Sequence, residues 1–146
     1  MSKQLTKDTV ISIFKCGYKV NDELSAMFKT HGISLPQFNV LRILRGRKGE
    51  AANLSTIQEL MIHKMSNTTR LIDKLIEGGY VNRFVCKKNR RKIEIFITKK
   101  GLELLSTLDL QLDAKEQFLL NNLEDKEKEE LMRLLSKVQT SITTET

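Results

Sequence analysis

Short polar side chains and two basic ones occupy a predicted helix over residues 66–77. These are Ser66, Asn67, Thr69, Arg70 and Lys74. An asparagine amide can form two hydrogen bonds with adenine, and an arginine guanidinium can form two with guanine. Backbone N–H groups at the beginning of a helix also bind phosphate. The set is therefore a candidate for contacting base edges in a DNA major groove, with Lys74 one turn further on against a phosphate.

A second basic group lies between two segments with strand character. Residues 80–86 are rich in β-forming side chains, and isoleucines at 93, 95 and 97 alternate with Glu94 and Phe96. The segment between them contains Lys87, Lys88, Asn89, Arg90 and Arg91. The strands predict a hairpin with a narrow basic tip. Arginine is drawn to the negative potential of a narrow minor groove, so Arg90 and Arg91 are candidates for contact there, beside Lys88 and Asn89.

The net charge of +7 is concentrated around these two groups. Residues 55–100 hold eleven lysines and arginines but four acidic residues, while the rest of the chain is balanced. A focused basic segment on a neutral frame favours a polyanionic partner, here double-stranded DNA.

Each of these features also has a simpler interpretation. Ser66 is a favoured residue type for capping a helix and needs no other role. Arg70 and Lys74 could belong to a solvated face, and the hairpin tip could be a soluble turn. A basic surface could also meet an acidic protein, which makes a winged-helix adaptor for protein–protein contact the alternative function.

Helix signals frame the candidate residues. Ser34, Pro36 and Gln37 form a capping box with proline in the first turn. The stretch Ser55-Thr56-Ile57-Gln58 repeats the box pattern and predicts a short helix to about Met61. Ser66 caps the helix 66–77, which Gly78 and Gly79 end. Two short helices followed by a hairpin predict a winged helix-turn-helix in a mainly α (α+β) protein.

Long helices are expected on both sides of that unit. Apolar residues recur at steps of three and four over 6–30, where Thr6 or Asp8 is the expected cap and Gly32 the stop. Helices are also expected over 99–120, capped by Thr98, and from Glu124 or Asp125 onward. We therefore expect dimerisation helices at 1–33 and 99–146 around a DNA-binding domain at 34–98.

The apolar stripes of these helices favour a homodimer. A unit of about 65 residues cannot easily cover all of them, and an uncovered stripe is a liability in a monomer. The alternative is that the helices pack on their own winged-helix unit.

Enzyme and metal chemistry have no sequence signature here. His31 and His63 are isolated, no acidic cluster has metal-ligand spacing, and no phosphate loop or nucleophile motif occurs. We expect no enzyme, cofactor or metal. Cys16 is expected to be a buried, inert thiol and Cys86 to be mostly structural, as is usual for reduced cytoplasmic thiols. No apolar run reaches the ~18 residues of a membrane helix, and the polar N-terminus predicts no secretory signal.

Several motifs in order resemble the MarR family of bacterial winged-helix regulators. They are Leu54-Ser55-Thr56-Ile57-Gln58-Glu59-Leu60, Ser66-Asn67-Thr68-Thr69-Arg70-Leu71-Ile72-Asp73-Lys74-Leu75, Gly79-Tyr80-Val81-Asn82-Arg83, Asn89-Arg90-Arg91 and Ile97-Thr98-Lys99-Lys100-Gly101. The resemblance implies a DNA-binding homodimer, which we expect to be cytoplasmic and to bind a pseudo-palindromic operator. It also implies a repressor released by a small effector, which we place in the cleft between the dimer helices and the wing domain.

Asn89 departs from the pattern of that family, in which aspartate is common at this position of the wing. The carboxylate would help to orient the arginine two residues on, here Arg91. Asparagine can still form a hydrogen bond with a guanidinium, but without charge assistance. We therefore expect Arg91 to be less rigid before binding and the wing to be more positive.

Overall fold

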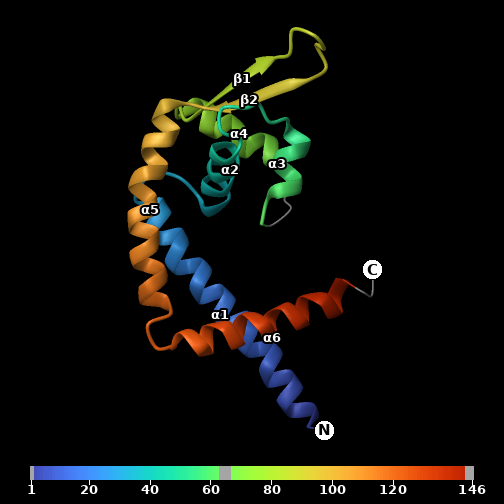
Figure 1. The fold of residues 1–146 in the computed structure, drawn as a ribbon, viewed down its shortest axis with the longest axis vertical. Helices are drawn as coiled ribbons and strands as arrows, with labels where there is room; N and C mark the ends of the chain where they lie inside the picture. The colour runs from blue at the N-terminus through green and yellow to red at the C-terminus, as the bar shows by residue number, and fades with distance from the viewer. Residues whose placement is uncertain (1, 63–66, 144–146) are drawn as a thin grey trace. The chain divides into compact units, whose positions relative to one another are not determined.

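The computed structural model describes residues 2–62 and 67–143, and all statements about the structure concern these residues (Figure 1). They form six helices and one antiparallel hairpin, in the order that the sequence predicts for a mainly α winged helix-turn-helix. The elements are α1 (Lys3–Lys29), α2 (Leu35–Gly46), α3 (Leu54–Leu60), α4 (Thr68–Glu77), β1 (Val81–Val85), β2 (Ile93–Ile97), α5 (Lys99–Leu119) and α6 (Asp125–Thr143). The chain divides into two compact units, residues 1–112 and 113–146.

Helix α1 begins earlier than its apolar pattern indicates. The Ser2 hydroxyl accepts a hydrogen bond from the Leu5 amide at 3.1 Å, so the predicted cap at Thr6 or Asp8 is wrong. The apolar periodicity that guided the prediction starts at Val10, whereas a helix can begin at any residue whose extended backbone offers a side-chain acceptor. At the other end, Gly32 has the left-handed φ of 74° that the predicted stop requires.

Helix α2 has the predicted capping box. The Ser34 amide donates to Gln37 Oε1 at 2.8 Å, and the Gln37 amide donates to Ser34 Oγ at 3.3 Å. The predicted apolar face, from Leu35 through Phe38 to Leu44, packs into the core. Helix α2 lies between α5 and α3 and below the hairpin in Figure 1, and it contacts α3, α4 and β2.

Helix α3 is capped by Asn53 rather than by the predicted box at Ser55. Asn53 Oδ1 accepts hydrogen bonds from the Thr56 amide at 2.8 Å and from the Thr56 hydroxyl at 2.9 Å. The preceding residue, Ala52, pairs with Ile95 of β2 and keeps the chain extended up to Asn53. The extended backbone needed at a cap is therefore fixed two residues before Ser55, which lies inside the helix.

This corrected cap predicts a stability difference between two neighbouring substitutions. Asn53→Ala should lower the free energy of unfolding by about 1 kcal/mol, because two N-terminal donors lose their acceptor. Ser55→Ala should change it by less than about 0.5 kcal/mol, because Ser55 is an exposed residue of the first helical turn. Urea unfolding monitored by circular dichroism measures both changes in the free energy of unfolding. A larger decrease for Ser55→Ala than for Asn53→Ala would show that Ser55 caps the helix after all.

The hairpin is anchored in the hydrophobic core by residues at its base. Val81 pairs with Ile97, Arg83 with Ile95 and Val85 with Ile93. Val81 and Ile95 are buried, whereas the side chains of β1 beyond Val81 are exposed. After β2, the Thr98 hydroxyl accepts a hydrogen bond from the Gly101 amide at 3.1 Å, which confirms the predicted cap of α5.

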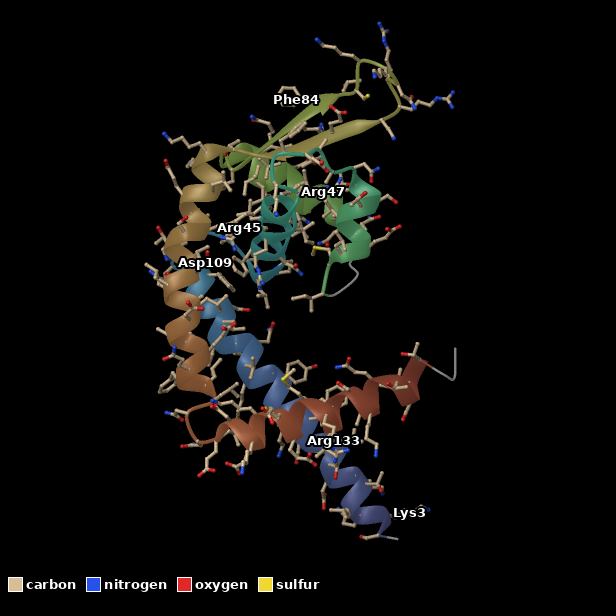
Figure 2. The ribbon with its side chains drawn as sticks, in the orientation of Figure 1. Lys3, Arg45, Arg47, Phe84, Asp109 and Arg133 are labelled. Atoms are coloured by element: carbon tan, nitrogen blue, oxygen red, sulfur yellow. The ribbon has the colours of Figure 1, made fainter. Side chains whose placement is uncertain are left out.

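One hydrophobic core joins the end of α1, the winged-helix elements and the first part of α5. Phe28 of α1 stacks on Phe38 of α2 with ring centroids 4.4 Å apart, and Leu105 and Leu108 of α5 are fully buried. At the edge of this core, the Arg45 guanidinium donates to both carboxylate oxygens of Asp109, the shorter contact being 2.6 Å (Figure 2). Helices α2 and α5 are thereby connected by packing and by charge.

Much of α1 is left uncovered by the other residues that the structure describes. Met27 packs against the core, but Val10, Ile13 and Phe14 are exposed, Phe14 to 61%. Cys16 is exposed as well, so the prediction of a buried thiol is wrong for the isolated chain. The reason is that Cys16 lies on the part of the helix that extends beyond the core.

The second compact unit contains α6 and the end of α5. Helix α6 begins at Asp125, one of the two predicted starts, and none of its described residues is buried. The apolar stripe of α6 is largely exposed to solvent, with the Leu134 side chain 46% exposed. On its polar side, two hydrogen bonds from Arg133 stabilise the Glu130 carboxylate and lower the pKa of Glu130.

No helix within the described ranges combines the length and the apolar character needed to cross a membrane.

Candidate nucleic-acid interface

Helix α4 separates a core face from an exposed face. Thr68, Leu71, Ile72 and Leu75 are buried, which fixes the rotation of the helix. Asn67, Thr69, Arg70 and Lys74 are exposed. The structure therefore brings four of the predicted residues of this helix to the surface together. Ser66 lies outside the described residues.

The beginning of α4 differs from the prediction in one detail. Asn67 occupies the N-cap position with φ −110° and ψ 28°, and its side chain makes no capping hydrogen bond. The helix that was expected to begin at residue 66 thus begins at Thr68. Because the amide of Asn67 is not used as a cap, it keeps its capacity for the two hydrogen bonds that recognition of adenine would require. The predicted stop is confirmed, since Gly79 has a φ of 77° after the last helical residue.

The tip of the wing is an ordered turn that carries the basic side chains outward. The Cys86 amide donates to the Lys92 carbonyl and the Lys92 amide to the Asn89 carbonyl, both at 2.9 Å. Asn89 Oδ1 accepts from the backbone amide of Arg91 at 3.1 Å. Asn89 therefore shapes the turn through the backbone amide of Arg91. All side chains from Lys87 to Arg91 are exposed.

An ion pair that the sequence analysis missed connects the wing to α4. Arg83 Nη1 of β1 lies 3.3 Å from Asp73 Oδ1 of α4. The sequence contained a usable signal, because Asp73 is one of few acidic residues in the basic segment. The pairing itself depends on the register of the hairpin over the helix, which a single sequence does not specify.

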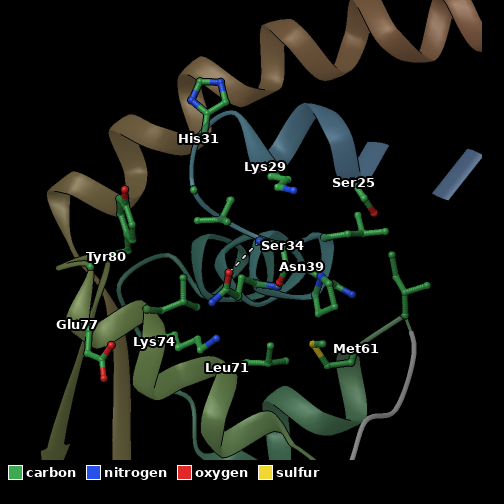
Figure 3. Close-up of a pocket in the computed structure, with 18 of the residues that line it drawn as sticks. Ser25, Lys29, His31, Ser34, Asn39, Met61, Leu71, Lys74, Glu77 and Tyr80 are labelled. Atoms are coloured by element: carbon green, nitrogen blue, oxygen red, sulfur yellow. Dashed lines mark hydrogen bonds between the residues drawn. The ribbon is translucent and has the colours of Figure 1, made fainter. Parts of the chain in front are cut away.

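A cavity of about 1140 Å³ lies beside the core side of α4 (Figure 3). Its wall includes Ile33, Leu71 and Leu75, and its polar rim includes Lys29 and Lys74. His31, also at the rim, forms a hydrogen bond from Nε2 to Gln111 Oε1 of α5 at 2.9 Å. Lys74 thus lies between this cavity and the exposed face of the helix.

No group of three histidine, cysteine, aspartate or glutamate side chains within the described ranges could hold a metal ion.

Comparison with known proteins places this arrangement in a family. Residues 33–93, which contain α2, α3, α4 and β1 and reach the first residue of β2, match the sequence profile of the MarR family. The chain carries a MarR-family domain. PecS, a transcriptional regulator from Dickeya dadantii, is 28% identical over 82% of this chain and 73% of its own length. YetL, a transcriptional repressor from Bacillus subtilis, is 25% identical over 86% of this chain and 75% of its own length.

Solved structures extend the likeness beyond the MarR-family domain. A MarR transcription factor from Planctomyces limnophilus is 29% identical, with a TM-score of 0.71 over 93% of this chain and 98% of its own. A cysteine-to-serine mutant of MarR from Escherichia coli, complexed with operator DNA, shares the fold at 23% identity, with a TM-score of 0.76 over 86% and 89%. PecS, YetL and the Planctomyces limnophilus protein are described as transcription regulators, which agrees with the expectation that this chain is not an enzyme.

Proposed function

We propose that this MarR-family protein is a transcriptional regulator that binds double-stranded DNA as a homodimer. Helix α4 enters the major groove, and the wing at residues 87–91 reaches the minor groove. One observation carries the proposal, namely that Arg70 and Lys74 of α4 and the basic side chains of the wing are exposed on two elements that extend from a single hydrophobic core. The distance between α4 and the wing is therefore fixed before the protein binds DNA, so neither element loses much conformational entropy on binding.

The homodimer rests on the apolar surfaces that a single chain leaves open. The first half of α1 exposes Val10 and Phe14, and α6 exposes Leu134 and Val138. The end of α1 already packs on its own winged-helix core, so only the outer part of the helix needs a partner. A second copy offers the same surfaces under two-fold symmetry. Two copies of α4 then match a pseudo-palindromic operator.

Repression relieved by a small effector is the finer part of the proposal. The cavity beside α4 combines an apolar wall with Lys29 and Lys74 at its rim, which suits a small molecule with an anionic group. Such a molecule can release DNA only if it binds one spacing of the two α4 helices better than the other.

The wing provides the test that separates DNA binding from the adaptor alternative. Arg91→Ala should weaken binding to a selected duplex, most strongly where A·T-rich flanks narrow the minor groove. A plot of log affinity against log salt concentration should become shallower by about two units per dimer, about 0.9 for each lost phosphate contact. Lys126→Ala is the control, because Lys126 is exposed on α6 outside the basic segment.

Affinity measured by fluorescence anisotropy across a salt series gives both quantities. Unchanged affinity and slope for Arg91→Ala on both A·T-rich and G·C-rich flanks would exclude the wing from the interface. The adaptor alternative would then gain weight, particularly if a protein partner bound with little dependence on salt.

A further inference from the structure

The exposed face of α4 carries an acidic residue where a DNA-binding helix should avoid one. Arg70 and Asp73 are three positions apart and therefore neighbours on the helix surface. If Asp73 were unpaired, its carboxylate would repel phosphate and could also attract the Arg70 guanidinium away from a base. Asp73 therefore needs another cation if Arg70 is to contact DNA.

The hairpin supplies that cation. Arg83 lies on the same face of the sheet as Val81 and Ile95, whose side chains are buried against the core. This face turns Arg83 toward α4, where its guanidinium lies 3.3 Å from the Asp73 carboxylate. The two side chains are 45% and 48% exposed, and Val85, the next residue of β1 on this face, is 61% exposed. Arg83 thus lies where the hairpin leaves the body of the domain.

We propose that Arg83 is a positioning residue that determines specificity by occupying Asp73, which keeps Arg70 available for a base. The inference rests on the proposed DNA-binding function and adds a residue that contacts no base itself. An ion pair as exposed as this one contributes little to folding stability, so its effect should appear in DNA binding.

Three variants test this role, namely Arg83→Ala, Asp73→Asn and the double variant. Arg83→Ala should weaken binding to a selected duplex about tenfold, since the dimer holds two copies of the pair and each is worth about threefold. The loss on a scrambled duplex should be smaller, because a captured Arg70 no longer distinguishes bases. Asp73→Asn should stay within about threefold of wild type, because an amide makes no ion pair with Arg70.

The double variant decides between mechanisms. It should bind like Asp73→Asn, because Arg83 has no function when the carboxylate is gone. If Arg83 contacts a phosphate directly, the double variant should stay as weak as Arg83→Ala and its salt dependence should be shallower. If the ion pair only holds the wing in position, Asp73→Asn should bind DNA as weakly as Arg83→Ala. Either of these two results would overturn the proposal.

Two controls separate this inference from the function on which it rests. Wild-type protein that binds selected and scrambled duplexes equally would refute the proposed function, and this inference with it. Selective wild-type binding that Arg83→Ala leaves unchanged would refute the inference alone. Thermal unfolding should be nearly the same for all variants, and a large loss of stability in Arg83→Ala would also contradict the proposal.

Discussion

Replacing Arg70 by alanine is expected to remove most of the preference for one base pair in each half of the operator. A bidentate contact between an arginine and a guanine is worth about 1–3 kcal/mol of discrimination, and a two-fold dimer makes it twice. Asn67→Ala should act in the same way at an adenine. Arg70 is exposed on α4 and Asn67 is exposed at the N-cap position before it, and the buried Leu71, Ile72 and Leu75 fix the rotation of the helix.

Lys74→Ala is the matched control on the same helix. A lysine that contacts only a phosphate should weaken binding to all sequences by a similar factor. Binding of each variant to a panel of duplexes with single substitutions measures the discrimination at every position. If Arg70→Ala and Asn67→Ala keep the sequence preference of the wild type, the assignment of these residues to base contacts is wrong.

Placing aspartate at Leu135 or Leu131 is expected to disrupt the homodimer. Both residues belong to the apolar stripe of α6, where Leu131 is exposed and Leu135 is half-buried among the described residues. A carboxylate buried in an apolar interface without a partner costs several kcal/mol, enough to shift micromolar protein toward monomer or aggregates. Ser136→Asp adds the same charge to α6 away from this stripe and should leave the dimer intact.

Light scattering after size exclusion measures the mass directly. Wild-type protein and Ser136→Asp should have about twice the chain mass of 16.8 kDa at micromolar concentration. A wild-type mass near that of one chain would contradict the proposed assembly. It would also favour packing of the terminal helices on their own domain.

The sequence predicted the ends of helices correctly where the cap or stop depends only on residues close by in the chain. The box between Ser34 and Gln37, the stop at Gly79 and the cap at Thr98 depend on neighbours within three residues. The mainly α winged-helix order followed from these signals, and the comparisons confirm the MarR resemblance. In contrast, the cap of α3 was assigned to the wrong residue because Asn53 is held extended by a distant strand pair, between Ala52 and Ile95.

The interface could be predicted only as a set of residue types. The sequence indicated which cations gather between residues 55 and 100, but it could not show that Arg83 meets Asp73 or that Arg45 meets Asp109. These pairs depend on how a hairpin or a helix packs across the core. The exposure of Cys16 escaped prediction for a related reason, because the apolar pattern of α1 continues past the core that covers its end.

The most direct test of the central claim is selection of bound fragments from a random pool of DNA duplexes by the wild-type protein. We expect an enriched pseudo-palindrome whose half-sites lie about one helical turn apart, 10–10.5 base pairs, or a multiple of it. Affinity for the enriched duplex should exceed that for a scrambled one by about 10³-fold or more at physiological salt. A pool that shows no enriched sequence after repeated rounds, with equal affinity for all duplexes, would contradict the claim.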